Sequence, residues 1–277
     1  MIFASIFNLA LKSESYEALS LLRTVADTEA LDVFGHKLLS TAAAVGNQWA
    51  FDMLVTQRAD LNARDSAGRT ALFMAALHGQ KAIVKLLLAR DDVDVNIPDF
   101  TMKSPLYAAA SLSDDHILKL FLARTDLNVR AADSSGFTPI FEAVYRGRVE
   151  AVVLLLDHAN SDMSMLWNPV RHESLLIPAN FPVNWKSKNG LTALALAAKA
   201  REMDVVKLLL ERDDVDVYTR DNQGKTNMDL AVQDGHKDIV KLLEHDQRTR
   251  RRIIHSTPNL PSPQSEPPWV PPTDNHS

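Results

Sequence analysis

The fold is decided by the stretch Asp65–Asn96, which reads DSAGRTALFMAALHGQKAIVKLLLARDDVDVN. Its first residues have turn chemistry, with Gly68 where a positive φ is favoured. The hydroxyl of Thr70 suits a helix start, because it can accept a hydrogen bond from a backbone N–H that the first turn leaves without a partner. Gly79 suits the end of that helix, and residues 81–88 form an apolar stripe too hydrophobic to face water. The stretch predicts a turn followed by two short helices.

The same order of turn, helix, glycine and helix recurs along the chain. All nine glycines fall at two phases of this repeat, either two residues before a Lys or Thr anchor or nine residues after one. The anchors are Lys37, Thr70, Ser104, Thr138, Thr192 and Thr226, at spacings of 33, 34, 34, 54 and 34 residues. A period of about 33 residues indicates a repeat architecture.

One unit of two short helices cannot bury both of its faces, so the units must stack on one another. A globular bundle of unrelated helical hairpins would not keep the glycines in phase. The sequence therefore predicts an all-α solenoid of about six repeats, preceded by a degenerate repeat over residues 1–30. The first unit is apolar where a terminal cap would be polar. This favours truncation of the chain or an N-terminal partner, with packing of the unit on itself as the alternative.

The unit resembles the ankyrin repeat in its D-x-x-G-x-T turn, its glycine between helices and its I-V-x-L-L-L second helix, over about residues 31–246. The resemblance implies an ankyrin solenoid whose helix–turn–helix units are joined by β-hairpin or turn fingers. The ankyrin His of T-P-L-H is absent from every copy, so we expect weaker contacts between repeats; Ser40, Phe73, Tyr107, Phe141, Ala195 and Asp229 stand there. The R-D-D-V-D-V form at 90–95 and 212–217 is similar to ankyrin arrays of filamentous fungi.

Composition excludes several classes of protein. The 35 acidic and 30 basic residues give a net charge of −5, which argues against coating nucleic acid or an anionic membrane. The absence of cysteine excludes disulfide scaffolds, thiolate zinc sites and cysteine nucleophiles. No apolar run approaches the roughly 18 residues of a membrane span. We expect no membrane and no direct nucleic-acid partner, and a cytoplasmic location.

The sequence carries none of the common catalytic motifs. The aspartates at 91–94 and 213–216 lack the EF-hand spacing and its closing Glu, so we interpret them as parts of solvated loops. His78 and His236 lie beside the turn between two helices, where a structural role is expected. We therefore expect a non-enzymatic protein without cofactor or metal.

The resemblance implies that a partner binds in a concave groove formed by the finger tips and the exposed side of the first helices. Aromatic and aliphatic residues alternate with basic ones at these phases, as at the centres of protein interfaces. We expect an extended or helical partner segment with some acidic character. The expected partner-binding residues are Phe34, His36, Arg69, Leu77, Phe100, Lys103, Leu112, Phe137, Tyr145, Arg146, Lys188, Leu191 and Lys225.

Two segments interrupt or follow the array. The 54-residue spacing contains an insertion over residues 161–181, which either shapes the recognition surface or packs on neighbouring helices. Seven of the thirteen prolines lie in residues 258–272, and we expect residues 247–277 to be a disordered Arg/Pro-rich tail. Its P-x-x-P-type segments suit an SH3- or WW-type groove.

Two other functions stay open at this point. The arginines at 248–252 suit a nuclear import signal, which would make the chain a nuclear transcription coregulator. Alternatively, the array is the regulatory region of a larger polypeptide with an enzymatic part.

Overall fold

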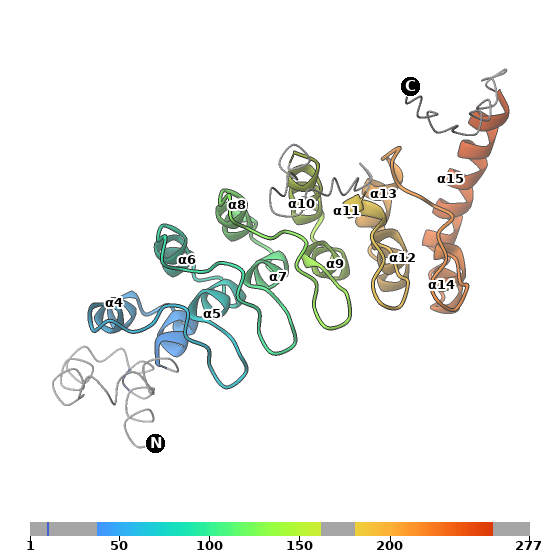
Figure 1. Ribbon diagram of the computed structural model, residues 1–277. Helices are drawn as coiled ribbons and strands as arrows, with labels where there is room; N and C mark the ends of the chain where they lie inside the picture. The colour runs from blue at the N-terminus through green and yellow to red at the C-terminus, as the bar shows by residue number, and fades with distance from the viewer. Residues whose placement is uncertain (1–9, 11–37, 162–180, 257–277) are drawn as a thin grey trace, which may run out of the picture.

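The computed structural model describes residue 10, residues 38–161 and residues 181–256. Within these ranges the chain forms helices joined by turns, with no strand (Figure 1). After helical residues 38–45, the helices are α4 (Gln48–Thr56), α5 (Ala71–Leu77), α6 (Lys81–Leu88), α7 (Pro105–Ala110), α8 (His116–Leu122), α9 (Pro139–Tyr145), α10 (Val149–Ser161), α11 (Phe181–Asn184), α12 (Ala193–Ala200), α13 (Met203–Leu210), α14 (Asn227–Gln233) and α15 (Lys237–Ser256).

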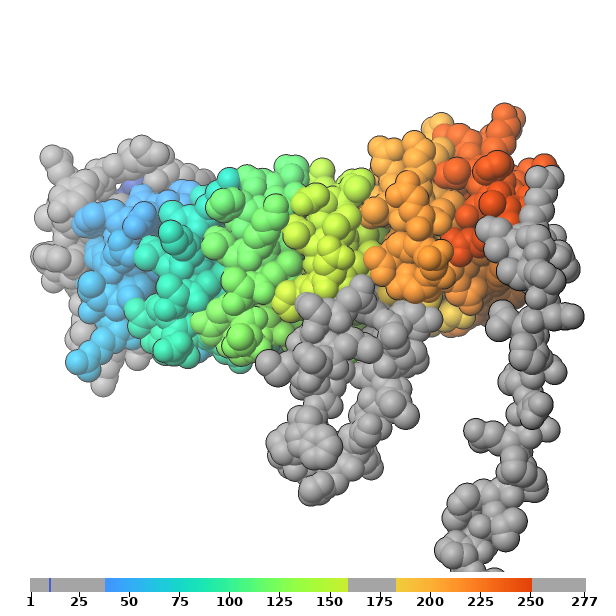
Figure 2. Space-filling view, turned by 90° about the horizontal axis from the view of Figure 1, so that it is seen from above, coloured from blue at the N-terminus to red at the C-terminus, as the bar shows by residue number. Residues whose placement is uncertain are grey.

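The helices form two rows along one axis. The inner row, next to the fingers, contains α5, α7, α9, α12 and α14, and the outer row contains α4, α6, α8, α10, α13 and α15 (Figure 1). In the space-filling view, the repeats follow one another in chain order from one end of the molecule to the other (Figure 2). The predicted all-α ankyrin-type solenoid is thus confirmed.

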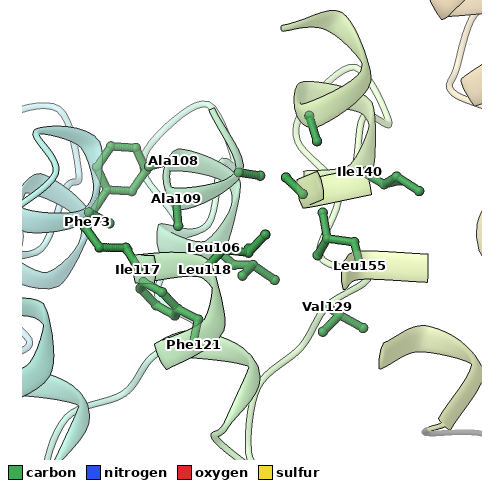
Figure 3. Close-up of a cluster of buried hydrophobic side chains, with 14 of the residues drawn as sticks. Phe73, Leu106, Ala108, Ala109, Ile117, Leu118, Phe121, Val129, Ile140 and Leu155 are labelled. Atoms are coloured by element: carbon green, nitrogen blue, oxygen red, sulfur yellow. The ribbon is translucent and has the colours of Figure 1, made fainter. Parts of the chain in front are cut away.

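One continuous hydrophobic core runs between the two rows. Figure 3 draws part of it, where Leu106 of α7, Phe121 of α8 and Leu155 of α10 belong to one cluster of buried side chains. Ala109 of α7 and Ala143 of α9 are also fully buried, and their small side chains let neighbouring inner helices approach closely. Each repeat therefore buries its apolar faces only with the help of its neighbours.

The predicted helix starts are present. The hydroxyl of Thr70 accepts a hydrogen bond of 3.2 Å from the backbone N–H of Phe73, and Ser104, Thr192 and Thr226 do the same at their helices. Thr138 makes no such side-chain bond, and the N–H of Phe141 donates instead to the backbone carbonyl of Thr138 at 2.9 Å.

The fingers are turns held together by backbone hydrogen bonds. The N–H of Asp65 donates to the carbonyl of Arg69 at 2.9 Å, and the later fingers repeat this closure. Each of the later fingers also bonds to the one before it, as in the 3.0 Å bond from the N–H of Phe100 to the carbonyl of Ala67. Among the described residues the only ladder contact is an isolated bridge between Arg220 and Thr226, so the fingers are turns and not β-hairpins with strands.

Close approach of neighbouring fingers explains the first glycine of the repeat at Gly68, Gly136 and Gly190, whereas at Gly224 only the positive φ requires it. Gly68 has a φ of +81°, and a Cβ there would lie 2.8 Å from the backbone N of Phe100. Gly136 and Gly190 face the next finger in the same way. Met102 occupies the equivalent place in its repeat with a φ of +66°, which is a strained conformation for a side chain with a Cβ.

Asparagine side chains link the loops on the opposite edge. The Nδ2 of Asn96 donates to the carbonyl of Asp126 at 2.7 Å, and its Oδ1 accepts from the N–H of Asn128 at 2.8 Å. Asn62 and Asn184 make the same pair of bonds to the following repeat. At three junctions between successive repeats, one asparagine side chain therefore bonds both a donor and an acceptor of the next repeat.

The expectation of weaker contacts where the ankyrin His is missing needs a correction at one interface. Tyr107 stands at the His position of α7, and its hydroxyl donates to Oε2 of Glu142 in α9 at 2.9 Å. The two histidines interpreted as structural also bond to carbonyls, His78 to Met74 within α5 and His236 to Ala198 of the preceding repeat.

The C-terminal boundary also differs from the prediction. α15 continues to Ser256, so residues 247–256 are helical and not part of a tail. Arg250 shows why the helix is extended: its Nη2 donates to the carbonyls of Leu210 and Arg212, at 2.8 and 3.2 Å, and its Nε bonds to Asp246. Arg250, one of the arginines expected to form an import signal, therefore donates hydrogen bonds to carbonyls at the end of α13.

The predictions for the degenerate first repeat, Phe34, His36, most of the insertion and residues 257–277 lie outside the described residues. Ala10 is the exception in the first segment, and it is buried in the core.

Candidate functional site

The predicted partner-binding residues that the structure describes lie in two rows on the finger side of the inner helices. Finger residues just before the helices form the first row, and residues at the helix ends form the second. The first row contains Arg69, Lys103, Phe137, Leu191 and Lys225, and the second contains Leu77, Leu112, Tyr145 and Arg146. Phe100 and Lys188 lie further out on their fingers and are exposed.

Two of these residues differ from the expected exposure. Leu191 is only 8% exposed, because it packs with Ala195 and Leu230 in a small cluster between α12 and α14. Phe137 is half-buried and its ring stacks on Phe141 at 5.2 Å between centroids. Leu191 therefore forms part of the floor of the surface and Phe137 part of its wall, which corrects the prediction that both stand free for a partner.

Two aromatic residues are well exposed. The ring of Phe100 is 67% exposed, and the guanidinium of Arg64 lies 4.9 Å from its centroid. Tyr145 is 55% exposed at the end of α9, with the Arg146 guanidinium 5.9 Å from its ring centroid. Exposed aromatic side chains beside arginine are the residue types that dominate binding energy at protein interfaces.

Several basic residues of the predicted site already have intramolecular partners. Arg69 forms an ion pair of 2.7 Å with Asp65 of its own finger. Burial raises the pKa of the Asp65 carboxyl, but hydrogen bonds from Arg69 and from the turn lower it further, so its pKa lies below the usual value. The ammonium of Lys103 lies 5.0 Å from the centroid of the Tyr107 ring.

A buried carboxylate connects α7 and α9 beneath this surface. Glu142 is 9% exposed, accepts from the Tyr107 hydroxyl, and pairs with the Nε of Arg146 at 2.9 Å. Burial raises the pKa of Tyr107, and the charge of Glu142 raises it further. The phenol therefore stays protonated as a donor, and the network fixes the position of Arg146 at the surface.

Two hollows lie on this face between the last inner helices. The first, about 720 Å³, lies between α9 and α12 and is lined by Phe137, Tyr145, Arg146, Asn189, Leu191, Leu196, Lys199, Ala200, Glu202 and Asp234. The second, about 390 Å³, lies between α12 and α14 and is lined by Asn189, Leu191, Lys199, Asp221, Asn222, Gln223, Lys225, Leu230 and Gln233.

The structure thus brings together Phe137, Tyr145, Arg146, Leu191 and Lys225, and leaves the other described candidates outside these hollows. The selected set omitted Asn189, Lys199 and Gln233, which also line them. All three occupy the same repeat phases as the expected residues: the phase rule gives Lys199 as a groove position, and applied to every repeat it would also have found Asn189 and Gln233.

Within the described ranges, no group of three or more His, Cys, Asp or Glu side chains is arranged to hold a metal ion. One aspartate of each loop instead forms an ion pair at 2.7 Å, Asp92 with Arg90 and Asp214 with Arg212. None of the helices described is both long and apolar enough to span a membrane.

Comparison with known proteins gives the family. A family model described as ankyrin repeats in three copies matches residues 7–99, 93–165 and 172–252. The chain belongs to the ankyrin repeat family. The crystal structure of EF0377, an ankyrin repeat protein, is similar with a TM-score of 0.60 and 25% sequence identity, over 75% of this chain and 96% of that one.

One curated protein carries a related segment. The mitochondrial liver isoform of glutaminase from Rattus norvegicus is 41% identical over 63 residues, which is 22% of this chain. The match spans only 10% of the glutaminase, so the similarity concerns a small part of that protein.

Proposed function

We propose that this ankyrin array is a non-enzymatic scaffold or adaptor that holds a segment of a partner protein on its finger side. Ankyrin repeats generally mediate protein–protein interaction, and the proposal adds the surface used. The observation that carries it is Tyr145, an exposed aromatic side chain at the edge of a hollow with an apolar floor. An exposed aromatic side chain does not stabilise a surface that contacts only water, whereas a partner that covers it removes apolar area from water.

The experiment is partner capture by the immobilised full chain, with bound proteins identified by mass spectrometry. Phe100→Ala combined with Tyr145→Ala removes the two exposed rings and should abolish capture. Phe137 is left intact, because its stacked ring contributes to the fold. The control variant is Tyr218→Ala, an exposed tyrosine outside the two hollows. Equal capture by the double variant and the wild-type chain would refute the proposal, provided that both melt at similar temperatures.

A second function is favoured by the similarity to glutaminase. In this reading the array is the regulatory region of a larger polypeptide whose remainder is an enzyme. Sequencing the intact transcript on both sides of the coding region tests this directly. A start at Met1 and a stop after Ser277 would contradict it.

The location and the tail remain proposals too. We propose a cytoplasmic protein, with the nuclear coregulator as the alternative, tested by replacing Arg251 and Arg252 and following a fluorescent fusion. Arg250 is left unchanged in that test because it bonds to the end of α13. Contact of the proline-rich segment with an SH3- or WW-type domain is tested by binding of a peptide with residues 257–277.

A further inference from the structure

The two hollows adjoin each other. Asn189, Leu191 and Lys199 line both of them, so together they form one trough that crosses α9, α12 and α14. We refer to its parts as the α9–α12 compartment and the α12–α14 compartment. Lys199, at the end of α12, lines both compartments, so its positive charge acts on a ligand in either one.

The α9–α12 compartment is suited to an apolar side chain. Its floor is formed by Leu191 and Leu196, which are buried, and its walls include the rings of Phe137 and Tyr145. The charges at its rim balance, with Arg146 and Lys199 against Glu202 and Asp234. The charge of Arg146 is in addition paired with that of Glu142. The compartment therefore offers apolar contact more than a net charge.

The α12–α14 compartment is suited to a carboxylate. Lys199 and Lys225 line it, against one acid, Asp221. That acid is held in its own finger, where Oδ1 accepts from the N–H groups of Gln223 and Lys225 at 2.8 and 2.9 Å.

Neither lysine of this compartment forms a close ion pair with an acid of the described residues, although the charge of Lys225 also acts on Asp229. Lys225 Nζ donates to a neutral amide, Oε1 of Gln233, at 2.6 Å, and no ion pair joins either lysine to an acid within the described residues. Amide side chains of the lining can bond the backbone of an extended segment, which has both donors and acceptors.

We propose that the trough binds an extended peptide segment of a partner protein, with an apolar side chain in the first compartment and an Asp or Glu in the second. This rests on the proposed function and specifies the partner. Neighbouring packed helices are about 8–10 Å apart. An extended segment in the polyproline II conformation advances about 3.1 Å per residue and has three residues per turn, so its side chains at positions i and i+3 point to the same face. The two side chains are therefore about three residues apart, in the order Φ-x-x-D/E or its reverse.

The test uses the full chain and fluorescently labelled, acetylated and amidated peptides in a Gly/Ser frame. The probes contain Leu-Ser-Ser-Asp or Asp-Ser-Ser-Leu, and the controls contain Leu-Ser-Ser-Lys or Ser-Ser-Ser-Asp. Fluorescence anisotropy should show at least one probe binding about tenfold more tightly than both controls, equivalent to about 1.4 kcal/mol. Equal affinity of probes and controls, or no binding of any probe, would overturn the inference.

Matched variants locate the site. Lys199→Gln should weaken binding of the better probe about fivefold or more, since it removes a charge from the trough. Lys207→Gln removes the same charge from the outer helix α13 of the same repeat, outside both compartments, and should change affinity less than about twofold. Similar effects of the two variants would contradict the placement.

Failure of this inference is distinguishable from failure of the proposed function. If the array captures a partner protein and Lys199→Gln leaves that capture unchanged, the trough is wrong and the scaffold function stands. If the array captures no partner, the scaffold function itself fails.

Discussion

The hydroxyl of Tyr107 in α7 donates a hydrogen bond of 2.9 Å to the carboxylate of Glu142 in α9, 35 residues further along the chain. Glu142 also forms an ion pair with Arg146. The guanidinium of Arg146 lies at the surface and lines the α9–α12 compartment. A buried interface between two repeats and an exposed binding residue are thus parts of one network.

Replacing Tyr107 by Phe should lower the free energy of unfolding by about 1–3 kcal/mol, because the buried carboxylate of Glu142 loses one of its two partners. Urea denaturation followed by circular dichroism measures the change. Tyr218→Phe, on an exposed tyrosine, should stay within about 0.5 kcal/mol of the wild-type chain. Equal losses in the two variants would show that the bond contributes nothing specific.

Substitutions at the first glycine position of the repeat should lower or raise stability, depending on the residue that stands there. Gly68→Ala should destabilise the array by about 1–3 kcal/mol, since it combines a positive φ with a clash against the backbone of Phe100. Met102→Gly should stabilise it by about 0.5–1 kcal/mol, because it relieves the same conformation at the equivalent place. Thermal unfolding of both variants tests this, and a loss of stability in Met102→Gly would contradict it.

The asparagine contacts between repeats are tested by Asn96→Ala. This variant loses both of the bonds that the side chain makes to the next repeat and should be less stable by about 1–2 kcal/mol. Asn128→Ala is the matched control, because among the described residues that side chain accepts a bond only within its own loop, from the N–H of Arg130. A control variant as unstable as Asn96→Ala would argue against the role of the contacts between repeats.

Asp229 gives the array a dependence on pH. Its pKa is lowered below the ordinary value of 3.8, because its carboxylate accepts hydrogen bonds from the backbone N–H and the hydroxyl of Thr226 in a capping box. A lowered pKa in the folded state stabilises the fold above the unfolded-state pKa, and this contribution is lost as the pH falls through the folded-state value. Asp229→Asn should therefore be less stable than the wild-type chain at about pH 6, and the difference should shrink at about pH 3. A difference that is independent of pH would contradict this account.

Much of the fold could be predicted from the sequence, because its signals are local and repeated. A hydroxyl before the first helix, as at Thr70, and a glycine where φ must be positive, as at Gly68, each have one physical meaning wherever they occur. The extension of α15 could not be predicted in this way. It depends on Arg250 reaching carbonyls of α13, a contact across 38 to 40 residues.

The candidate site was less predictable, because phase gives the direction of a side chain but not what covers it. Leu191 lies at the same phase as the partly exposed Lys225, yet it is buried, because Leu230 of the next repeat packs on it. The trough itself depends on three helices and on where their side chains leave space, and no single repeat contains that information. Tyr145 and Arg146 were found by phase, since there exposure follows from the helix end alone.

The most direct measurement is hydrogen–deuterium exchange of the full chain, alone and with its captured partner. The account predicts slower exchange with the partner at the fingers around residues 187–191 and 221–225 and at the ends of α9 and α12, with the outer helices α6, α8 and α13 unchanged. Protection confined to the outer helices, with no change in the trough, would contradict it.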